Sequence, residues 1–391
     1  MLPLQGIVVV ALEHAVAAPF CTRQLADLGA RVIKIERPGG GDFARGYDGR
    51  VRGQSSHFVW TNRSKESLTL DLKHAEAPAI LARLLTGADV LVQNLMPGAA
   101  ARLGLSYEAL HATHPRLIVC DISGYGSDGP YREKKAYDLM IQSESGFLSV
   151  TGSAQEPAKA GCSIADIAAG MYAFSNILAA LIERGHTGHG RRIEISMLEA
   201  MVEWMGHPMY YAFDGAPPSR AGAAHATIYP YGPFPAGDGS TVMLGLQNER
   251  EWLAFCKEVL RQPDLAADER FCSNSRRTEA RAQLREIIVK AFSDLTGDQV
   301  IARLDEAQIS NARMNVMREV WEHRQLMARR RWVQVDTPGG PVPALLPPGA
   351  ADAGAVRMEA IPVLGQHTEA ILARLGFSVA DIERLRQLRA I

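Results

Sequence analysis

The sequence has few of the features that mark metal-binding, disulfide-bonded or nucleic-acid-binding proteins. It contains only five cysteines in 391 residues, with no CxxC pair and no histidine at ligand spacing. This argues against a zinc site or a disulfide framework, so we expect no metal. The formal net charge is −1, which favours neither nucleic acid nor an acidic membrane surface as a partner.

Targeting and membrane segments are also missing. Residues 1–20 are largely apolar but have no basic start, and their apolar run is far too short to span a bilayer. We therefore expect a cytoplasmic protein without a membrane partner.

Two nucleotide-binding signatures are absent as well. The turn after the first expected strand reads ALEHAVAAPF and contains no GxGxxG, and GxxxxGK[ST] does not occur. A nicotinamide dehydrogenase and a P-loop NTPase are therefore disfavoured.

Short β-branched runs alternate with helical patterns in the first half of the chain. Gly6–Leu12 (GIVVVAL) is nearly all apolar, as expected for a parallel strand buried on both faces. This alternation predicts an α/β protein with a mostly parallel, Rossmann-like sheet. Further strands are expected at Arg31–Glu36, Ser67–Leu72, Asp89–Gln93, Arg116–Ser123 and Arg192–Ser196, with helices at Pro19–Leu28, Ala75–Leu85, Asp166–Arg184 and Met197–Met205.

The length of the chain and two Pro/Gly-rich stretches, residues 214–240 and 337–354, predict a large domain and a smaller α+β domain. The two stretches are typical of loops or linkers. The expected bounds are 1–205 for the first part of the large domain, 206–224 for a linker, 225–320 for the small domain, 321–345 for a second linker and 346–391 for a C-terminal return to the large domain.

Basic residues gather where the first strands are expected to end. Such a cluster suits a phosphorylated ligand, although most lysines and arginines are simply solvated. The residues are Lys34, Arg37, Arg45, Arg50, Arg52, Arg63, Lys65, Lys73 and Arg102.

Four segments carry a family resemblance that covers nearly the whole chain in a conserved motif order. They are ADLGARVIKIERPGGGDFAR (26–45), NRSKESLTLDLK (62–73), VQNLMPGAAARLGLSYEAL (92–110) and DIAAGMYAFSNILAALIERGHTGHGRRIEISMLEA (166–200). Together they resemble the class III coenzyme A-transferases, the family of formyl-CoA transferase and carnitine CoA-transferase.

The resemblance implies that Asp166 is the catalytic nucleophile, because the family's aspartate starts the helix that begins DxxxG. The free amides and positive dipole end of a helix N-terminus stabilise a carboxylate there. The alternative role for Asp166 is a helix N-cap, which is the commoner reason for an aspartate at such a position.

The resemblance also implies coenzyme A as a substrate, with no tightly bound cofactor. The family positions near coenzyme A are Arg37, Lys73, Asn94, Leu95, Arg102 and Lys135. The candidates for the substrate pocket are Tyr137, Asp138, His225 and Tyr229.

The implied reaction moves coenzyme A from an acyl-CoA such as succinyl-CoA to a short, dicarboxylic acid such as itaconate, mesaconate or citramalate. It passes through an aspartyl anhydride and an aspartyl-CoA thioester, and the family's interlocked homodimer is the expected assembly. The alternatives are an acyl-CoA racemase or isomerase and a non-catalytic acyl-CoA-binding protein. Tyr137 stands where racemases of this fold carry a proton-transferring histidine, which disfavours racemisation.

Overall fold

The computed structural model describes residues 1–391 as two compact units. The first unit comprises Met1–Ser145, Ala160–Met205 and Arg324–Ile391, and the second comprises Gly146–Lys159 and Gly206–His323. The domain and linker bounds expected from the sequence stay a prediction.

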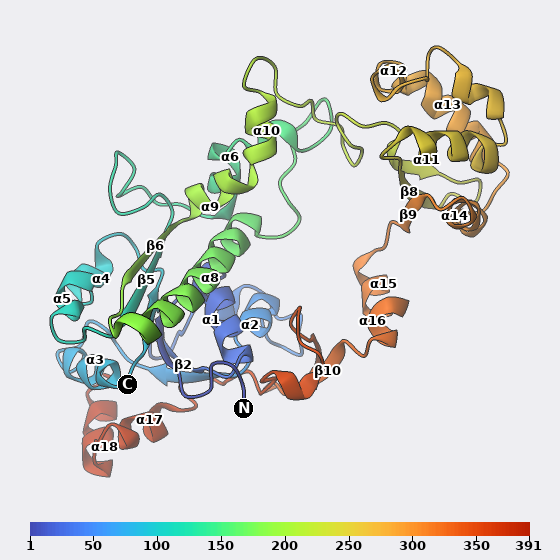
Figure 1. The fold of residues 1–391 in the computed structure, drawn as a ribbon. Helices are drawn as coiled ribbons and strands as arrows, with labels where there is room; N and C mark the ends of the chain where they lie inside the picture. Colours follow the sequence, from blue (N-terminus) through green and yellow to red (C-terminus); the bar gives the residue numbers. More distant parts are fainter. The chain divides into compact units, whose positions relative to one another are not determined.

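A six-stranded parallel sheet forms the centre of the first unit (Figure 1). Its strands lie in the order β3-β2-β1-β4-β5-β6, so the direction of winding reverses between β1 and β4. In open sheets of this kind, ligands bind beyond the carboxyl ends of the strands near such a reversal. The strands are β1 (Val8–Leu12), β2 (Arg31–Glu36), β3 (Lys65–Thr69), β4 (Val90–Gln93), β5 (Ile118–Ser123) and β6 (Arg192–Ser196).

Helices connect these strands, and the C-terminal segment returns to the same unit. The β10–β11 hairpin (Trp332–Val335 and Val342–Leu345) belongs to that segment. The helices are α1 (Ala17–Asp27), η1 (Phe43–Gly46), α2 (Ser56–Thr61), α3 (Ala77–Thr86), α4 (Ala99–Arg102), α5 (Tyr107–His111), α6 (Asp138–Glu144), α8 (Ile164–Thr187), α9 (Met197–Trp204), α16 (Arg324–Ala328), η4 (Ala353–Ala355), α17 (Thr368–Arg374) and α18 (Val379–Gln387).

The C-terminal helices complete the hydrophobic core of the first unit. Leu372 from α17 and Leu385 from α18 are fully buried and pack in one cluster with Leu81 of α3 and Leu91 of β4. Burial of each such side chain contributes about 1.5–3 kcal/mol of hydrophobic free energy. The first unit therefore depends on a segment about 300 residues further along the chain.

Helix α8 is long and apolar enough to cross a membrane by length and composition, and one of its faces packs within the first unit. It contacts α1, β5, β6 and α9, and Figure 1 shows it running beside α1. Its approach to α1 is close at Gly170, where an added Cβ would lie 2.7 Å from the Ala17 carbonyl oxygen. Only glycine allows this contact between the two helices.

The second unit contains a small antiparallel sheet, β7-β8-β9, covered by helices. The helix α13 supplies Leu284, Ile288 and Phe292 to a core that also contains Trp252. The elements are α7 (Phe147–Val150), α10 (Gly206–Tyr211), β7 (Tyr231–Pro235), β8 (Thr241–Gly245), α11 (Glu249–Ala254), η2 (Phe255–Val259), η3 (Pro263–Ala267), α12 (Asn274–Glu279), α13 (Arg281–Phe292), α14 (Gly297–Glu306), β9 (Ser310–Arg313) and α15 (Met317–Trp321).

Three predictions from composition and pattern need correction. The Pro/Gly-rich residues 214–240 include β7, whose prolines are tolerated because β7 pairs on one side only. The similar stretch 337–354 includes β11. Strand β3 begins at Lys65, two residues before the expected start at Ser67, because buried partners satisfy its polar side chains.

We predict that Gly170→Ala lowers the free energy of unfolding by about 1–3 kcal/mol, because the added methyl group overpacks the contact with α1. Gly185→Ala in the same helix is the matched control, since its Cβ would meet nothing within 4 Å. That change should raise stability by about 0.5–1 kcal/mol. Urea denaturation measures both, and a Gly170→Ala variant as stable as the parent would contradict the packing argument.

Candidate active site

Asp166 lies in the first turn of α8 but is not its N-cap. The cap position is Ser163, whose side chain makes no capping bond. The amide of Ala165 at this helix end instead donates to Asp138 Oδ1 at 2.8 Å. The N-cap role that the sequence left open for Asp166 is therefore excluded, and its carboxyl group is available for chemistry.

The environment of Asp166 raises the pKa of its carboxyl group to about 7. Burial is the largest cause, and the negative charge of Asp138 adds to it. The backbone N–H of Ala17, the first residue of α1, interacts with the carboxylate and acts in the opposite direction, lowering the pKa. Asp166 is mostly enclosed and titrates near neutral pH, which is typical of a functional carboxyl group.

Asp138 is held firmly at the start of α6. Besides the Ala165 amide, it accepts a hydrogen bond from Gln142 Nε2 at 2.6 Å. The same Gln142 accepts the backbone N–H of Ala160 at 2.9 Å. The preceding residue, Tyr137, exposes 70% of its surface. The structure thus brings Asp138 to Asp166 as an electrostatic neighbour, with Tyr137 beside it in the chain.

A row of aromatic rings follows the turn after β1 and the η1 segment. His14 stacks on Phe43 with ring centroids 5.2 Å apart, and Phe43 contacts Tyr47 at 5.8 Å. Burial raises the pKa of Tyr47, and the charges of Asp42 and Asp166 contribute, so the Tyr47 ring lies within electrostatic range of Asp166. Burial lowers the pKa of His14, which favours the neutral form of its ring.

A cavity of about 310 Å³ opens at the carboxyl ends of β1, β2, β3 and β4. Three of the six residues expected at coenzyme A line it, namely Arg37, Lys73 and Leu95. The other lining residues are Leu12, His14, Ile35, Glu36, Gly41, Phe43, Leu70, Asp71 and Leu72. The cavity therefore occupies the place near the winding reversal where ligands bind in open parallel sheets.

Asn94 adjoins this cavity but uses its side chain on the backbone. Its Oδ1 accepts the His14 N–H and its Nδ2 donates to the His14 carbonyl, each at 2.9 Å. It therefore fixes the turn after β1. Arg102 ends α4, and Lys135 is exposed in the loop before α6; neither lines the cavity.

The structure divides the basic cluster predicted from the sequence into two groups. Four of its members pair with buried carboxylates and are not free to bind phosphate: Lys34 with Glu13 and Asp42, Lys65 with Glu13, Arg45 with Glu36, and Arg63 with Asp27. Arg37, Arg50, Arg52, Lys73 and Arg102 are exposed and have no carboxylate partner. Only the second group is therefore available to a phosphorylated ligand.

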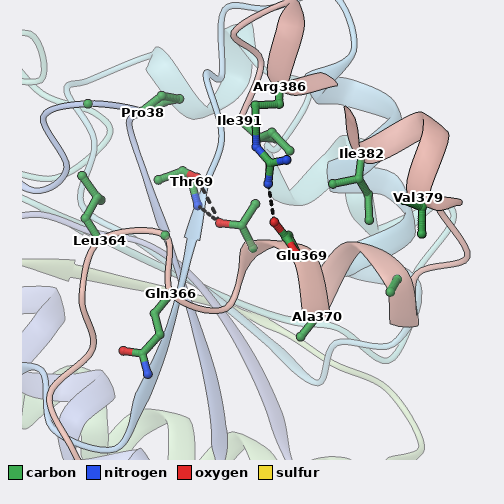
Figure 2. Close-up of a pocket in the computed structure, with 14 residues that line it drawn as sticks. Pro38, Thr69, Leu364, Gln366, Glu369, Ala370, Val379, Ile382, Arg386 and Ile391 are labelled. Carbon is green, nitrogen blue, oxygen red and sulfur yellow. Dashed lines mark hydrogen bonds and ion pairs between the residues drawn. The ribbon is translucent and has the colours of Figure 1, made fainter. Parts of the chain in front are cut away.

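A larger cavity, of about 890 Å³, lies elsewhere on the first unit (Figure 2). It is lined mainly by α17, α18 and the segment around Gln366, where Thr69 bonds to Thr368 and Arg386 pairs with Glu369. None of the expected site residues lines it. The expected site residues and the larger cavity therefore do not coincide.

His225 and Tyr229 belong to the second unit. The ring Nδ1 of His225 accepts the amides of Thr227 and Ile228, at 3.2 and 3.1 Å, and the ring stacks on Tyr231. Tyr229 is buried in the core of that unit. Both side chains have structural partners there, and their role in binding substrate stays a prediction.

A family model described as CoA-transferase family III matches residues 4–368. The chain belongs to this family.

Relatives of known activity extend along the full chain. A succinate–glutarate CoA-transferase of Agrobacterium fabrum is 34% identical, over 95% of this chain and 96% of that protein. A succinyl-CoA–D-citramalate CoA-transferase of Chloroflexus aurantiacus is 32% identical, over 100% of this chain and 98% of that protein. The crystal structure of a CaiB/BaiF family protein from Brucella suis matches with 34% identity and a TM-score of 0.84, over 96% of this chain and 99% of that chain. The chain is therefore a CoA-transferase with the fold of these proteins, as the resemblance predicted.

Sequence reasoning missed the buried charges of this transferase, above all Glu13 and Asp42. Both are fully buried beside Lys34, which is also fully buried. One signal was present in the sequence. A lysine in the middle of an otherwise apolar parallel strand must find a buried carboxylate, because an unpaired charge there costs several kcal/mol.

We predict that Asp166→Asn stabilises the protein, and more so at pH 8 than at pH 5. The folded-state pKa of Asp166 lies above the unfolded value, so the folded state binds this proton more tightly. The stability this gives is complete below the unfolded pKa and is lost as pH rises through about 7. The rise of the Asp166 pKa from 3.8 to about 7 limits the change in the free energy of unfolding to about 4 kcal/mol. Thermal unfolding at both pH values tests this, and an equal change in Tm at each would contradict the assigned environment.

Proposed function

We propose that this transferase moves coenzyme A from succinyl-CoA to a short dicarboxylate, with Asp166 as the covalent nucleophile. The observation that carries the proposal is the setting of the Asp166 carboxyl group. It is mostly enclosed, it titrates near pH 7, and it receives the Ala17 amide at the point where two helices begin.

The cavity and the nucleophile are joined by two short segments. The turn after β1 runs from His14, which lines the cavity, to Ala17, which meets Asp166. The η1 segment runs from Phe43, which also lines the cavity, to Tyr47 within electrostatic range of Asp166. Coenzyme A bound in the cavity therefore has a short path for its thioester end toward Asp166.

In the first half-reaction, the ionised Asp166 attacks the thioester carbonyl of succinyl-CoA. The C–S bond breaks, leaving a mixed anhydride and the thiolate of coenzyme A. The thiolate then attacks the Asp166 carbonyl carbon, so that an aspartyl-CoA thioester forms and succinate departs with the bridging oxygen. A carboxylate with a raised pKa is a better nucleophile than an ordinary aspartate and is still about half ionised at pH 7.

In the second half-reaction, the acceptor carboxylate attacks the aspartyl thioester and forms a second anhydride. The released thiolate attacks the acceptor carbonyl, which yields the new acyl-CoA and restores Asp166. Thioesters and anhydrides are similarly reactive, so the protein mainly has to position the groups and exclude water. The Ala17 amide is suited to stabilise the oxyanion that forms at Asp166 in each attack.

Recognition of coenzyme A is assigned to the exposed cations that have no carboxylate partner. Arg37 and Lys73 line the cavity, and Arg102 lies at the end of α4. The planar guanidinium groups suit phosphate oxygens in a two-pronged arrangement, and lysine supplies a point charge. Lys135 is assigned to the same ligand from its family position, and coenzyme A acts as a substrate with no cofactor required.

The choice of a dicarboxylate rests on the relatives. Those reported above act on succinate with glutarate or with D-citramalate as the second acid. Itaconate and mesaconate are acceptors of the same size and charge. Transfer to oxalate is carried out by an Acetobacter aceti relative that is 35% identical over 87% of this chain, and oxalate therefore belongs among the acids tested.

We further propose a homodimer in the cytoplasm. Apolar side chains stay uncovered on helices of both units, including Ile182 of α8 and Met317 of α15, which expose 67% and 76% of their surfaces. A second copy of the chain is the proposed partner for these faces. All five cysteines are unpaired, which fits a reducing compartment.

The test is a transfer assay with succinyl-CoA, a panel of mono- and dicarboxylic acids, and mass analysis of the products. The proposal predicts a new acyl-CoA that appears as succinate is released, with short dicarboxylates as the best acceptors. Asp166→Asn should reduce transfer by about 10³-fold or more, because no covalent intermediate forms. Its affinity for coenzyme A should stay within about threefold of the parent, since the cations that bind phosphate are unchanged.

Deuterated solvent supplies the control for the alternative function. Wash-in of deuterium at the α-carbon of the acyl group without any acceptor acid would identify a racemase or isomerase. Coenzyme A binding without exchange of any acid would identify a binding protein. Full transfer by Asp166→Asn would refute the proposed role of Asp166.

A further inference from the structure

The turn that presents Ala17 to Asp166 has a backbone conformation that needs outside support. Ala15 has φ of 59°, in the left-handed region that non-glycine residues seldom adopt. Such a conformation costs about 1 kcal/mol or more and persists only where surrounding contacts hold it. The contacts that hold it here come from two other segments of the first unit.

Asp42 supplies the contact at the strained residue itself. Its Oδ1 accepts the Ala15 N–H at 3.1 Å, and Asn94 binds the adjoining His14 backbone. The same Asp42 Oδ1 accepts the Ala44 N–H at 2.9 Å and so caps η1. One buried oxygen atom therefore joins the turn before α1 to the segment that carries Phe43 and Tyr47.

A buried set of balanced charges keeps Asp42 in place. Lys34 Nζ donates to Asp42 Oδ2 at 2.8 Å and lies 3.3 Å from Glu13 Oε1, and Lys65 Nζ donates to that same Glu13 oxygen at 2.7 Å. Two carboxylates thus face two ammonium groups, with no net charge. Removing one member would leave an uncompensated buried charge, whereas removing one carboxylate with one ammonium keeps the balance.

We propose that Asp42 is a positioning residue for the nucleophile. By holding Ala15 in the left-handed conformation, it fixes the direction in which α1 begins and hence the place of the Ala17 amide against Asp166. By capping η1, it holds Phe43 against His14 along the wall of the cavity. Asp42 acts chiefly through these backbone contacts, and its Oδ1 also lies 3.9 Å from the His14 ring Nδ1 on the cavity wall.

This inference rests on the proposed role of Asp166, and two double variants test it separately from that role. Asp42→Asn/Lys34→Met removes one charge of each sign but keeps an oxygen acceptor for the Ala15 and Ala44 amides. Asp42→Ala/Lys34→Met removes the same charges and also the acceptor. The two proteins have the same net charge and the same remaining Glu13–Lys65 pair, and differ only at the group that holds the turn.

The measurement is the single-turnover rate at which succinyl-CoA acylates Asp166, followed by acid quench and mass analysis of the peptide. We expect Asp42→Asn/Lys34→Met to acylate within about threefold of the parent and Asp42→Ala/Lys34→Met to be about 10- to 100-fold slower, as expected for a small misplacement of a reacting group. The affinity for coenzyme A, measured by calorimetry, should agree within about threefold between the two variants, because Arg37 and Lys73 are unchanged.

Equal acylation rates in the two folded variants would overturn the inference, and so would a rate difference that follows a matching loss of affinity for coenzyme A. A parent enzyme that forms no adduct on Asp166 would instead refute the proposed function. If the alanine variant does not fold, Asp42→Ser/Lys34→Met replaces it. Serine can still cap Ala44 but is too short to reach Ala15, so the same slower acylation is expected and an unchanged rate would overturn the inference.

Discussion

The close packing of α8 against the start of α1 is the constraint on which the rest of the site depends. Gly170 allows the Ala17 carbonyl oxygen to lie within 2.7 Å of the place that a side chain would fill. Four residues earlier on α8, one helical turn away, Asp166 meets the amide of the same Ala17. The DxxxG spacing therefore has a physical reason: its glycine brings the helices together, and its aspartate uses the contact.

The site is built on charges that the fold has already neutralised. The buried lysines of β2 and β3, Lys34 and Lys65, pair with the internal carboxylates Glu13 and Asp42, and so hold the turn instead of binding the ligand. Cations on the surface beyond the carboxyl ends of the strands, such as Arg37 and Lys73, have no carboxylate partner and are available to bind phosphate. Because the buried lysines are used for internal ion pairs and the surface cations are not, the turn is held in place while the cavity can still attract an anionic ligand.

The sequence was sufficient for the family, the parallel sheet and the placement of Asp166 in the first turn of a helix, because these depend on local periodicity and on motif order. The early start of β3 at Lys65 could not be predicted, since its polar side chains are satisfied by residues distant in the chain. The backbone role of Asn94 was hidden for the same reason. The Ala17 amide could not be foreseen at all, because its function arises only when two helices pack together.

The most direct test of the account follows an oxygen atom through the covalent cycle. If Asp166 exchanges partners as described, an acceptor acid labelled with ¹⁸O in both carboxylate oxygens must leave one labelled oxygen in the Asp166 side chain after a turnover with succinyl-CoA. Mass analysis of the peptide that contains Asp166 should show this gain of one ¹⁸O, and no other peptide should carry it. Product formed at the normal rate with no label in that peptide would contradict the account.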